Sequence, residues 1–283
     1  MKSNSLRFLF FAGISVFSAP AMAQYTFTCV PPTEHDIGPK AANVLVVLDV
    51  TGSMTSSSGE DVDGDGSNDS LLKVAKLAIA DVANSIYTPG VCGGVNDPLC
   101  DDVQLGIGYF GSDQLSGNPL GIDAKVVVNC DEDTAPSIIT SVNSQTAPGG
   151  TGTLTQDAMK LLALTPTLND SSRPNIAVVV TDGAPDTTAI ARAALTNVCA
   201  VRNRATNPVT TYMVGFGGGS AQQMNSVMAA GGGTGECCKD GATPPCAADK
   251  IVDPCVVGAA TMIASNSSLG SGYTCAGSFE ATG

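Results

Sequence analysis

Histidine is almost absent from this sequence, and no two cysteines are spaced as C-x-x-C. Tetrahedral zinc sites are built from histidine and cysteine at such spacings, so we expect no zinc site. The G-x-S-x-G pattern that carries the nucleophile of many serine hydrolases is also missing. The single histidine, His35, lies between Glu34 and Asp36 and is expected to be solvated. We therefore expect the protein not to be an enzyme.

Basic residues are scarce. The chain has 13 Lys and Arg against 26 Asp and Glu, which gives a net charge of -13. Such a field repels phosphate backbones and anionic membranes, so nucleic acid is excluded as an expected partner. The hydrophobic fraction of 43% with 14% charged residues is nevertheless typical of a chain that folds around a core.

Long apolar runs are missing after the first 23 residues, so no transmembrane segment is expected in the mature chain. The first 23 residues contain Lys2 and Arg7, the apolar run 8–17 and the sequence Ala21-Met22-Ala23. This order is typical of a secretory signal peptide. A membrane anchor is the alternative, but it needs about 20 consecutive apolar residues. We expect cleavage near Ala23 and a protein that is secreted, or located in the periplasm or at the cell surface.

Cysteines are plentiful, and all of them follow the expected cleavage point. An even number of cysteines in an exported chain predicts disulfide bonds. Cys92 and Cys100 flank a short loop and are predicted to form a local pair, whereas the sequence leaves the other pairings open. The ten cysteines are Cys29, Cys92, Cys100, Cys130, Cys199, Cys237, Cys238, Cys246, Cys255 and Cys275.

Two continuous apolar runs, 43–48 and 176–181, end in Asp49 and Asp182. Such runs are typical of strands that are covered on both faces in a parallel sheet. Weaker strands are predicted at 103–110, 125–129 and 209–216. Apolar residues at helical spacing predict helices at 70–87, 136–142, 154–164, 187–201 and 221–229, with Ser70 as an N-cap.

The alternation of strands and helices predicts the α/β class: a doubly wound, mostly parallel sheet flanked by helices. We expect a polar leader at 24–40 and one domain at 41–283. A segment at 231–272 is rich in Gly, Pro, Asp and Cys and is predicted to be a disulfide-rich insertion. A last short strand is expected near 277–281.

Oxygen ligands are concentrated at the predicted strand ends. Asp49, Thr51 and Ser53 occupy alternate positions of one short loop, and Asp182 follows another buried strand. Ligands of open parallel sheets bind beyond the carboxyl ends of strands, where neighbouring loops converge. Carboxylates and hydroxyls suit a hard cation such as Mg2+, which keeps some of its waters.

The same residues resemble a known family. Asp49-x-Thr51-x-Ser53 is similar to the D-x-S-x-S motif of von Willebrand factor type A domains, and Thr181-Asp182-Gly183 resembles their T-D-G. The loop 149–153, Gly-Gly-Thr-Gly-Thr, resembles the loop that supplies the family's third hydroxyl, which places that role on Thr151. The resemblance implies a metal-ion-dependent adhesion site with Mg2+ or Mn2+ bound by Asp49, Thr51, Ser53, Thr151 and Asp182.

In this family an acidic side chain of a partner protein completes the coordination, so the resemblance implies a secreted or cell-surface adhesion module. The loops 54–69, 147–152 and 184–188 would then determine specificity. A structural subunit of a pilus or envelope assembly is the alternative, and a metal-dependent hydrolase is a weaker one. The family also has a helix after the last strand that this chain lacks, so we expect either a fragment or a domain without this helix.

A second cation site is predicted in the acidic stretch 61–69. Its spacing resembles an EF-hand loop, with glycine at the sixth position, but Leu72 occupies the place of the final glutamate. The expected ion is Ca2+, and the alternative is a solvated acidic loop that precedes the helix. The candidate ligands are Asp61, Asp63, Asp65, Ser67 and Asp69.

Overall fold

The computed structural model describes residues 42–87, 103–111, 121–130, 135–147, 152–216, 221–277 and 279–281. Several expectations lie outside these ranges: the signal peptide 1–23, the leader 24–40, the pair Cys92 and Cys100, and Thr151. Every helix within the described ranges is too short or too polar to cross a bilayer.

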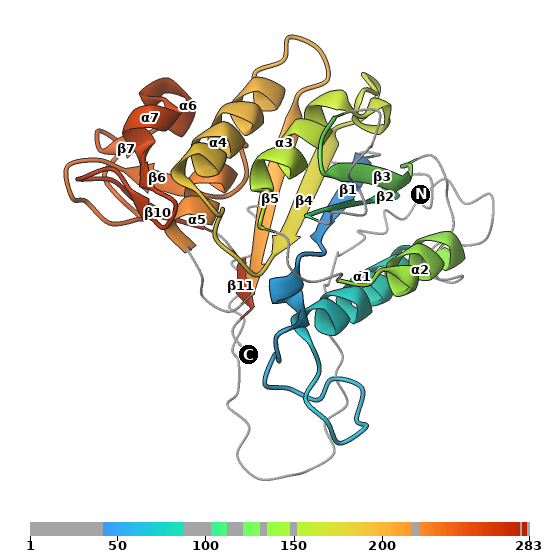
Figure 1. Ribbon diagram of the computed structural model, residues 1–283. Helices are drawn as coiled ribbons and strands as arrows, with labels where there is room; N and C mark the ends of the chain where they lie inside the picture. Colours follow the sequence, from blue (N-terminus) through green and yellow to red (C-terminus); the bar gives the residue numbers. More distant parts are fainter. Residues whose placement is uncertain are drawn as a thin grey trace, which may run out of the picture. The chain divides into compact units, whose positions relative to one another are not determined.

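A six-stranded sheet with the order β11-β5-β4-β1-β2-β3 forms the centre of the domain (Figure 1). Neighbouring strands are parallel except for β3, which runs antiparallel to β2. The strands are β1 (Ala42–Asp49), β2 (Val103–Phe110), β3 (Ala124–Val128), β4 (Asn175–Thr181), β5 (Val209–Phe216) and β11 (Phe279–Ala281).

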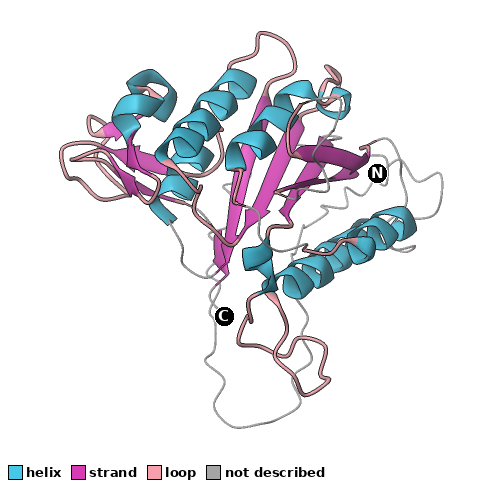
Figure 2. Cartoon of the chain, viewed as in Figure 1, coloured by secondary structure: helices cyan, strands magenta, loops and turns pink. Residues whose placement is uncertain are grey.

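Helices cover both faces of this sheet, as Figures 1 and 2 show. They are α1 (Leu71–Tyr87), α2 (Ala135–Ser144), α3 (Thr155–Leu164), α4 (Thr188–Arg202) and α5 (Ala221–Ala230), with short 3-10 turns η1 (Gly52–Thr55) and η3 (Pro166–Leu168). The apolar residues of α1 and α2 join one buried cluster, and those of α3, α4 and α5 join another.

The packing of β1 explains why its residues 44–48 are all apolar. Leu45 and Val47 pack in the cluster with α3 and α4, while Val46 and Leu48 pack in the cluster with α1 and α2. Successive side chains of a strand point to opposite faces, so a strand covered on both sides has no polar face. The predicted fold class, α/β with a mostly parallel sheet, is confirmed.

The predicted elements agree with the structure within one or two residues at most ends. The predicted N-cap also agrees, because the Ser70 hydroxyl accepts a hydrogen bond from the backbone N–H of Lys73 at 3.2 Å.

The cysteine-rich segment is more regular than the sequence suggested. It contains β6 (Glu236–Cys238), β7 (Ile251–Val252), α6 (Pro254–Val257), α7 (Ala259–Met262), β8 (Ile263–Ser265), β9 (Ser268–Leu269) and β10 (Thr274–Ala276). Strands β10, β6 and β7 form a small antiparallel sheet, so the segment extends past the predicted boundary at Gly272. Because Cys237, Ile263 and Cys275 are buried in the cluster with α4 and α5, the segment completes the core of the domain.

Three disulfide bonds tie this segment together, which confirms the prediction that it is disulfide-rich. They join Cys199 to Cys255, Cys237 to Cys275 and Cys238 to Cys246. The first links α4 to α6. The other two explain the adjacent cysteines of β6, because neighbouring residues of a strand point to opposite faces and require different partners.

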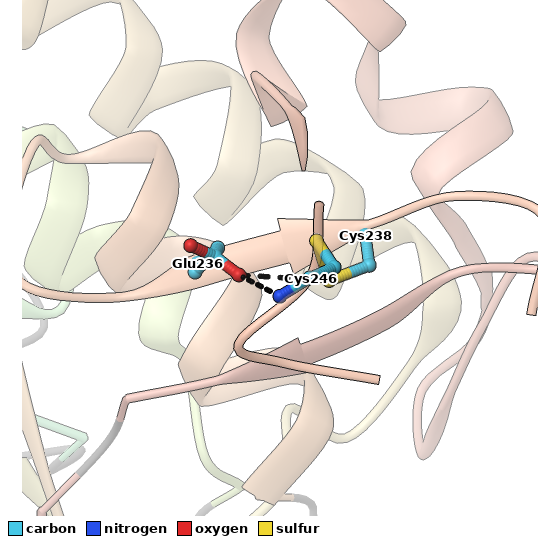
Figure 3. Close-up of side chains that lie close together, drawn as sticks. All are labelled: Glu236, Cys238 and Cys246. Atoms are coloured by element: carbon cyan, nitrogen blue, oxygen red, sulfur yellow. Dashed lines mark hydrogen bonds between the residues drawn. A yellow bond between two sulfur atoms is a disulfide. The ribbon is translucent and has the colours of Figure 1, made fainter. Parts of the chain in front are cut away.

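Figure 3 shows Glu236 beside the bond between Cys238 and Cys246. A glutamate and two free cysteine thiols at these distances could bind one metal ion. Here the sulfurs are bonded to each other, and Glu236 instead accepts a hydrogen bond from the backbone N–H of Cys246 at 2.8 Å. This group therefore stabilises the insertion.

The chain adds strands to one side of β1 first and to the other side afterwards, so the strand order reverses between β1 and β4. The chain runs from β1 through β2 to β3 on one side, and then from β4 through β5 to β11 on the other. Strands β1 and β4 are hydrogen-bonded neighbours, with Leu48 opposite Val180. Loops diverge at such a reversal and leave room for a ligand beyond the carboxyl ends of the two strands.

Candidate metal centre

The carboxyl ends of β1 and β4 bring the candidate ligands Asp49 and Asp182 to the same edge of the sheet. Asp49 is the last residue of β1 and is completely buried. Asp182 follows the last residue of β4 and is partly exposed. The sheet register thus places one buried and one accessible carboxylate at the site where the succession of strands reverses.

Hydrogen bonds fix both oxygens of the Asp49 carboxylate. Oδ1 accepts from the backbone N–H of Thr51 at 2.8 Å, and Oδ2 accepts from the Thr181 hydroxyl at 2.6 Å. The chain then turns directly into η1, with Thr51 in an extended conformation at its N-cap. This tight turn presents Thr51 and Ser53 on the same side as Asp49.

Ser53 connects the two strand ends. Its hydroxyl donates to Oδ1 of Asp182 at 2.8 Å and lies 2.9 Å from the Thr51 hydroxyl. Because a serine hydroxyl has one proton, the Thr51 hydroxyl must be the donor toward Ser53. Four of the five predicted ligands, Asp49, Thr51, Ser53 and Asp182, therefore belong to one continuous hydrogen-bonded group.

Burial disfavours negative charge at this group. It raises the pKa of Asp49 to about 6, although hydrogen bonds from Thr181 and Thr51 act in the opposite direction. Burial also raises the pKa of Asp182, against the hydrogen bond from Ser53. The nearby charge of Asp182 adds a smaller repulsion that favours protonated Asp49.

The chemistry of these residues fits a divalent cation. All the donors to Asp49 and Asp182 are neutral, and neither carboxylate takes part in an ion pair among the described residues. Two carboxylates and two hydroxyls within one hydrogen-bonded group offer oxygen ligands, and no Lys, Arg or His of the described residues forms an ion pair with these carboxylates. A hard divalent ion prefers such ligands.

The third predicted segment is described in part. Thr151 lies outside the described residues, but Gly152 and Thr153 follow it directly. A Cβ atom on Gly183 would lie 3.0 Å from the Thr153 hydroxyl, and the backbone N–H of Thr153 donates to Asp186 at 2.9 Å. The residues next to Thr151 therefore pack against the loop that begins with Asp182.

Two residues at this edge were not assigned a role from the sequence. Thr181 orients Asp49 through its hydroxyl, and its place in the T-D-G segment was the available signal. Gly111 follows β2 with a φ of 85°, and a Cβ atom there would lie 2.3 Å from the Thr51 side chain. A side chain at position 111 would thus displace a candidate ligand.

The acidic loop 61–69 brings three of its five candidate ligands close together. Carboxylates of Asp61, Asp63 and Asp65 lie close enough together to bind one ion, and all three residues are exposed. Asp69 is buried and forms an ion pair with Lys73, whose ammonium also lies 2.5 Å from Asp63. Hydrogen bonds from this ammonium hold the pKa values of Asp63 and Asp69 below their usual range. Lys73 thus pairs with two of the carboxylates that the sequence predicts as Ca2+ ligands.

The sequence matches no protein-family model and no curated protein. The chain has a low similarity to several solved structures. The mussel byssus proximal thread matrix protein 1, with a zinc-occupied MIDAS motif, is 15% identical over 64% of this chain and 37% of its own, with a TM-score of 0.43. The pilus adhesin SpaC of Lactobacillus rhamnosus GG, in its open conformation, is 14% identical over 70% of this chain and 27% of its own, with a TM-score of 0.47.

Manganese-loaded TRAP protein of Plasmodium vivax is 17% identical over 68% of this chain and 64% of its own, with a TM-score of 0.42. The chain spans well under half the length of the first two proteins. These likenesses are weak, and the assignment of the site depends on its own residues. The described part of this chain is an α/β domain with D-x-T-x-S and T-D-G segments at adjacent strand ends, and these segments resemble those of von Willebrand factor type A domains.

Proposed function

We propose that this protein is a secreted or cell-surface binding module in which a divalent cation bridges to an acidic group of a partner protein. Mg2+ or Mn2+ would be bound by Asp49, Thr51, Ser53, Thr151 and Asp182. The observation that carries this proposal is the hydrogen-bonded connection from Thr51 through Ser53 to Asp182 beside the buried Asp49. The bound ion would supply an electrophilic position for an incoming carboxylate.

Export is supported by the three disulfide bonds, because such bonds persist in oxidising compartments outside the cytosol. Binding, as opposed to hydrolysis, is supported by the ligand set. Metal-activated water requires a general base that is free to accept a proton close to the ion, whereas both carboxylates of this group accept hydrogen bonds and are proposed as metal ligands.

Calorimetric titration of Mg2+ and Mn2+ into chelator-treated mature protein tests the proposal. We expect one site in the wild type and none in the double variant Asp49→Ala/Asp182→Ala, because both carboxylates of the site are then missing. The matched control is Asp63→Ala/Asp65→Ala, which removes the same charge from the other acidic loop and should retain Mn2+ binding. A wild type that binds neither ion, or a first variant that binds normally, would contradict the proposal.

Calcium at the loop 61–69 is a second proposal, supported by the three adjacent carboxylates. We expect weak Ca2+ binding, with a Kd on the order of 0.1 to 1 mM, which is typical of extracellular sites. Asp63→Ala/Asp65→Ala should abolish it. Lys73→Met should strengthen it, because the ammonium group then no longer competes with the ion for Asp63 and Asp69. A Ca2+ titration that is unchanged in both variants would exclude this loop.

A further inference from the structure

The loop between β4 and α4 carries a third aspartate, Asp186, four residues after Asp182. Its Oδ1 accepts a hydrogen bond from the backbone N–H of Thr153 at 2.9 Å. Its carboxylate also fills the space beside Gly152: a Cβ atom on this glycine would lie 1.5 Å from Oδ2 and 2.6 Å from Cγ. Position 152 therefore accepts only glycine while Asp186 keeps this conformation.

The opposite side of the same segment is also in contact with the β4–α4 loop. Thr153 is 6% exposed, and its hydroxyl lies where a side chain on Gly183 would come within 3.0 Å. Residues 152 and 153 are thus enclosed between Gly183, the neighbour of Asp182, and Asp186. One loop contacts the segment at two points.

Asp186 is itself held in place by the cysteine-rich segment. The side-chain amide of Asn266, in the turn between β8 and β9, donates to the backbone oxygen of Asp186 at 3.3 Å. Arg192 of α4 donates twice to the backbone oxygen of Ile263, at 3.0 and 2.9 Å. Gln223 of α5 donates to the backbone oxygen of Ser265 at 2.5 Å. The hairpin that supports Asp186 is therefore fixed to two helices.

We propose that Asp186 is a positioning residue of the metal centre. It ties the segment that follows the candidate ligand Thr151 to the loop that carries Asp182, so that two parts of the ligand set remain in register. This inference rests on the proposed function. Residues that orient ligands without touching the ion usually change metal affinity by about 10- to 100-fold when they are replaced. The cysteine-rich segment then contributes to metal binding through Asn266.

Four single variants and the double variant Gly152→Ala/Asp186→Ala test this role in the mature, chelator-treated protein. Asp186→Ala removes the acceptor for Thr153, whereas Asp186→Asn keeps an oxygen in the same position. Gly152→Ala places a methyl group against the carboxylate. Asp81→Ala, on an exposed position of α1, removes the same charge elsewhere. The readouts are the Kd for Mn2+ and the hydrogen-exchange rate of the Thr153 amide measured by NMR without metal.

We expect Asp186→Ala to raise the Kd for Mn2+ by about 10- to 100-fold, and Asp186→Asn to stay within about threefold of the wild type. The Thr153 amide should exchange faster in Asp186→Ala, and Asp81→Ala should change neither readout. Gly152→Ala should weaken Mn2+ binding in the wild-type background but add little in Asp186→Ala, because the clash is then absent.

Three results would overturn the positioning role alone: normal Mn2+ affinity in Asp186→Ala, unchanged exchange of the Thr153 amide, or an Asp186→Asn variant as impaired as Asp186→Ala. The last result would assign the effect to charge and not to the hydrogen bond. A wild type that binds neither Mn2+ nor Mg2+ overturns the proposed function itself. The two failures are therefore distinguishable.

Discussion

Replacing Cys199 and Cys255 by alanine is expected to lower the free energy of unfolding by about 4 kcal/mol. The bond closes a loop of 56 residues, and in the chain-entropy model a longer loop restricts the unfolded chain more strongly. It also joins α4, which covers the central sheet, to α6 of the cysteine-rich segment. Urea unfolding of the double variant beside the wild type measures the loss.

Cys238→Ala/Cys246→Ala is the matched control for this prediction. Its loop spans 8 residues and lies within the cysteine-rich segment, so the same model gives a loss of about 2 to 3 kcal/mol. The order of the two losses is the test. Equal losses, or a larger loss in the control, would show that the link between α4 and α6 does not stabilise the domain in the manner inferred.

Asp49→Asn is expected to raise the free energy of unfolding of the metal-free protein at pH 8 by about 3 kcal/mol. In the wild type the pKa of Asp49, about 6, lies about two units above the value of 3.8 for an unperturbed aspartate. The physical cause is burial: the wild type must keep a charged carboxylate away from water, whereas the variant has a neutral amide of the same shape. The amide oxygen can still accept from the Thr51 N–H, and the amide nitrogen can donate to the Thr181 hydroxyl.

The pH dependence follows from the same shift. Between about pH 4 and pH 6 the folded state retains a proton at Asp49 that the unfolded state has released, so the wild type loses stability as the pH rises through this window. Below about pH 4 the carboxyl is protonated in both states, and the difference between wild type and variant should disappear. Urea unfolding of metal-free samples at pH 3.5 and pH 8 measures this dependence.

Metal should reverse the order of stability at pH 8. An ion that binds only the folded protein stabilises it by about 4.1 kcal/mol at 1,000 times its Kd, which exceeds the difference of about 3 kcal/mol without metal, and the variant lacks one of the ligands. A variant that is less stable than the wild type without metal, or equally stabilised by Mn2+, would contradict the assigned environment of Asp49.

Much of the fold could be predicted from the sequence because its strands are covered on both faces. A run of consecutive apolar residues such as 44–48 is typical of a strand that is buried on both faces of a parallel sheet, and the polar residue after the run marks the end of the strand. The same reasoning located Asp49 and Asp182, since parallel neighbours end at one edge. Whether the two aspartates lie close together depends on whether β1 and β4 are neighbours in the sheet, and only the structure shows this.

Other features depend on contacts between residues far apart in sequence. The partner of Cys237 is Cys275 because β6 and β10 pair antiparallel, with these two residues opposite each other. No local pattern specifies this pairing. Similarly, Lys73 reaches the loop 61–69 from the first turns of α1, so the acidic spacing alone did not indicate that Asp63 and Asp69 share an ammonium.

Anomalous diffraction at the manganese absorption edge, from crystals of chelator-treated protein soaked in Mn2+, tests the proposed metal site most directly. We expect a strong peak beyond the ends of β1 and β4, about 2 Å from the Ser53 hydroxyl and next to the Asp182 carboxylate. A peak confined to the loop 61–69, or no peak at this edge in crystals whose ends of β1 and β4 are free of lattice contacts, would contradict the proposed site.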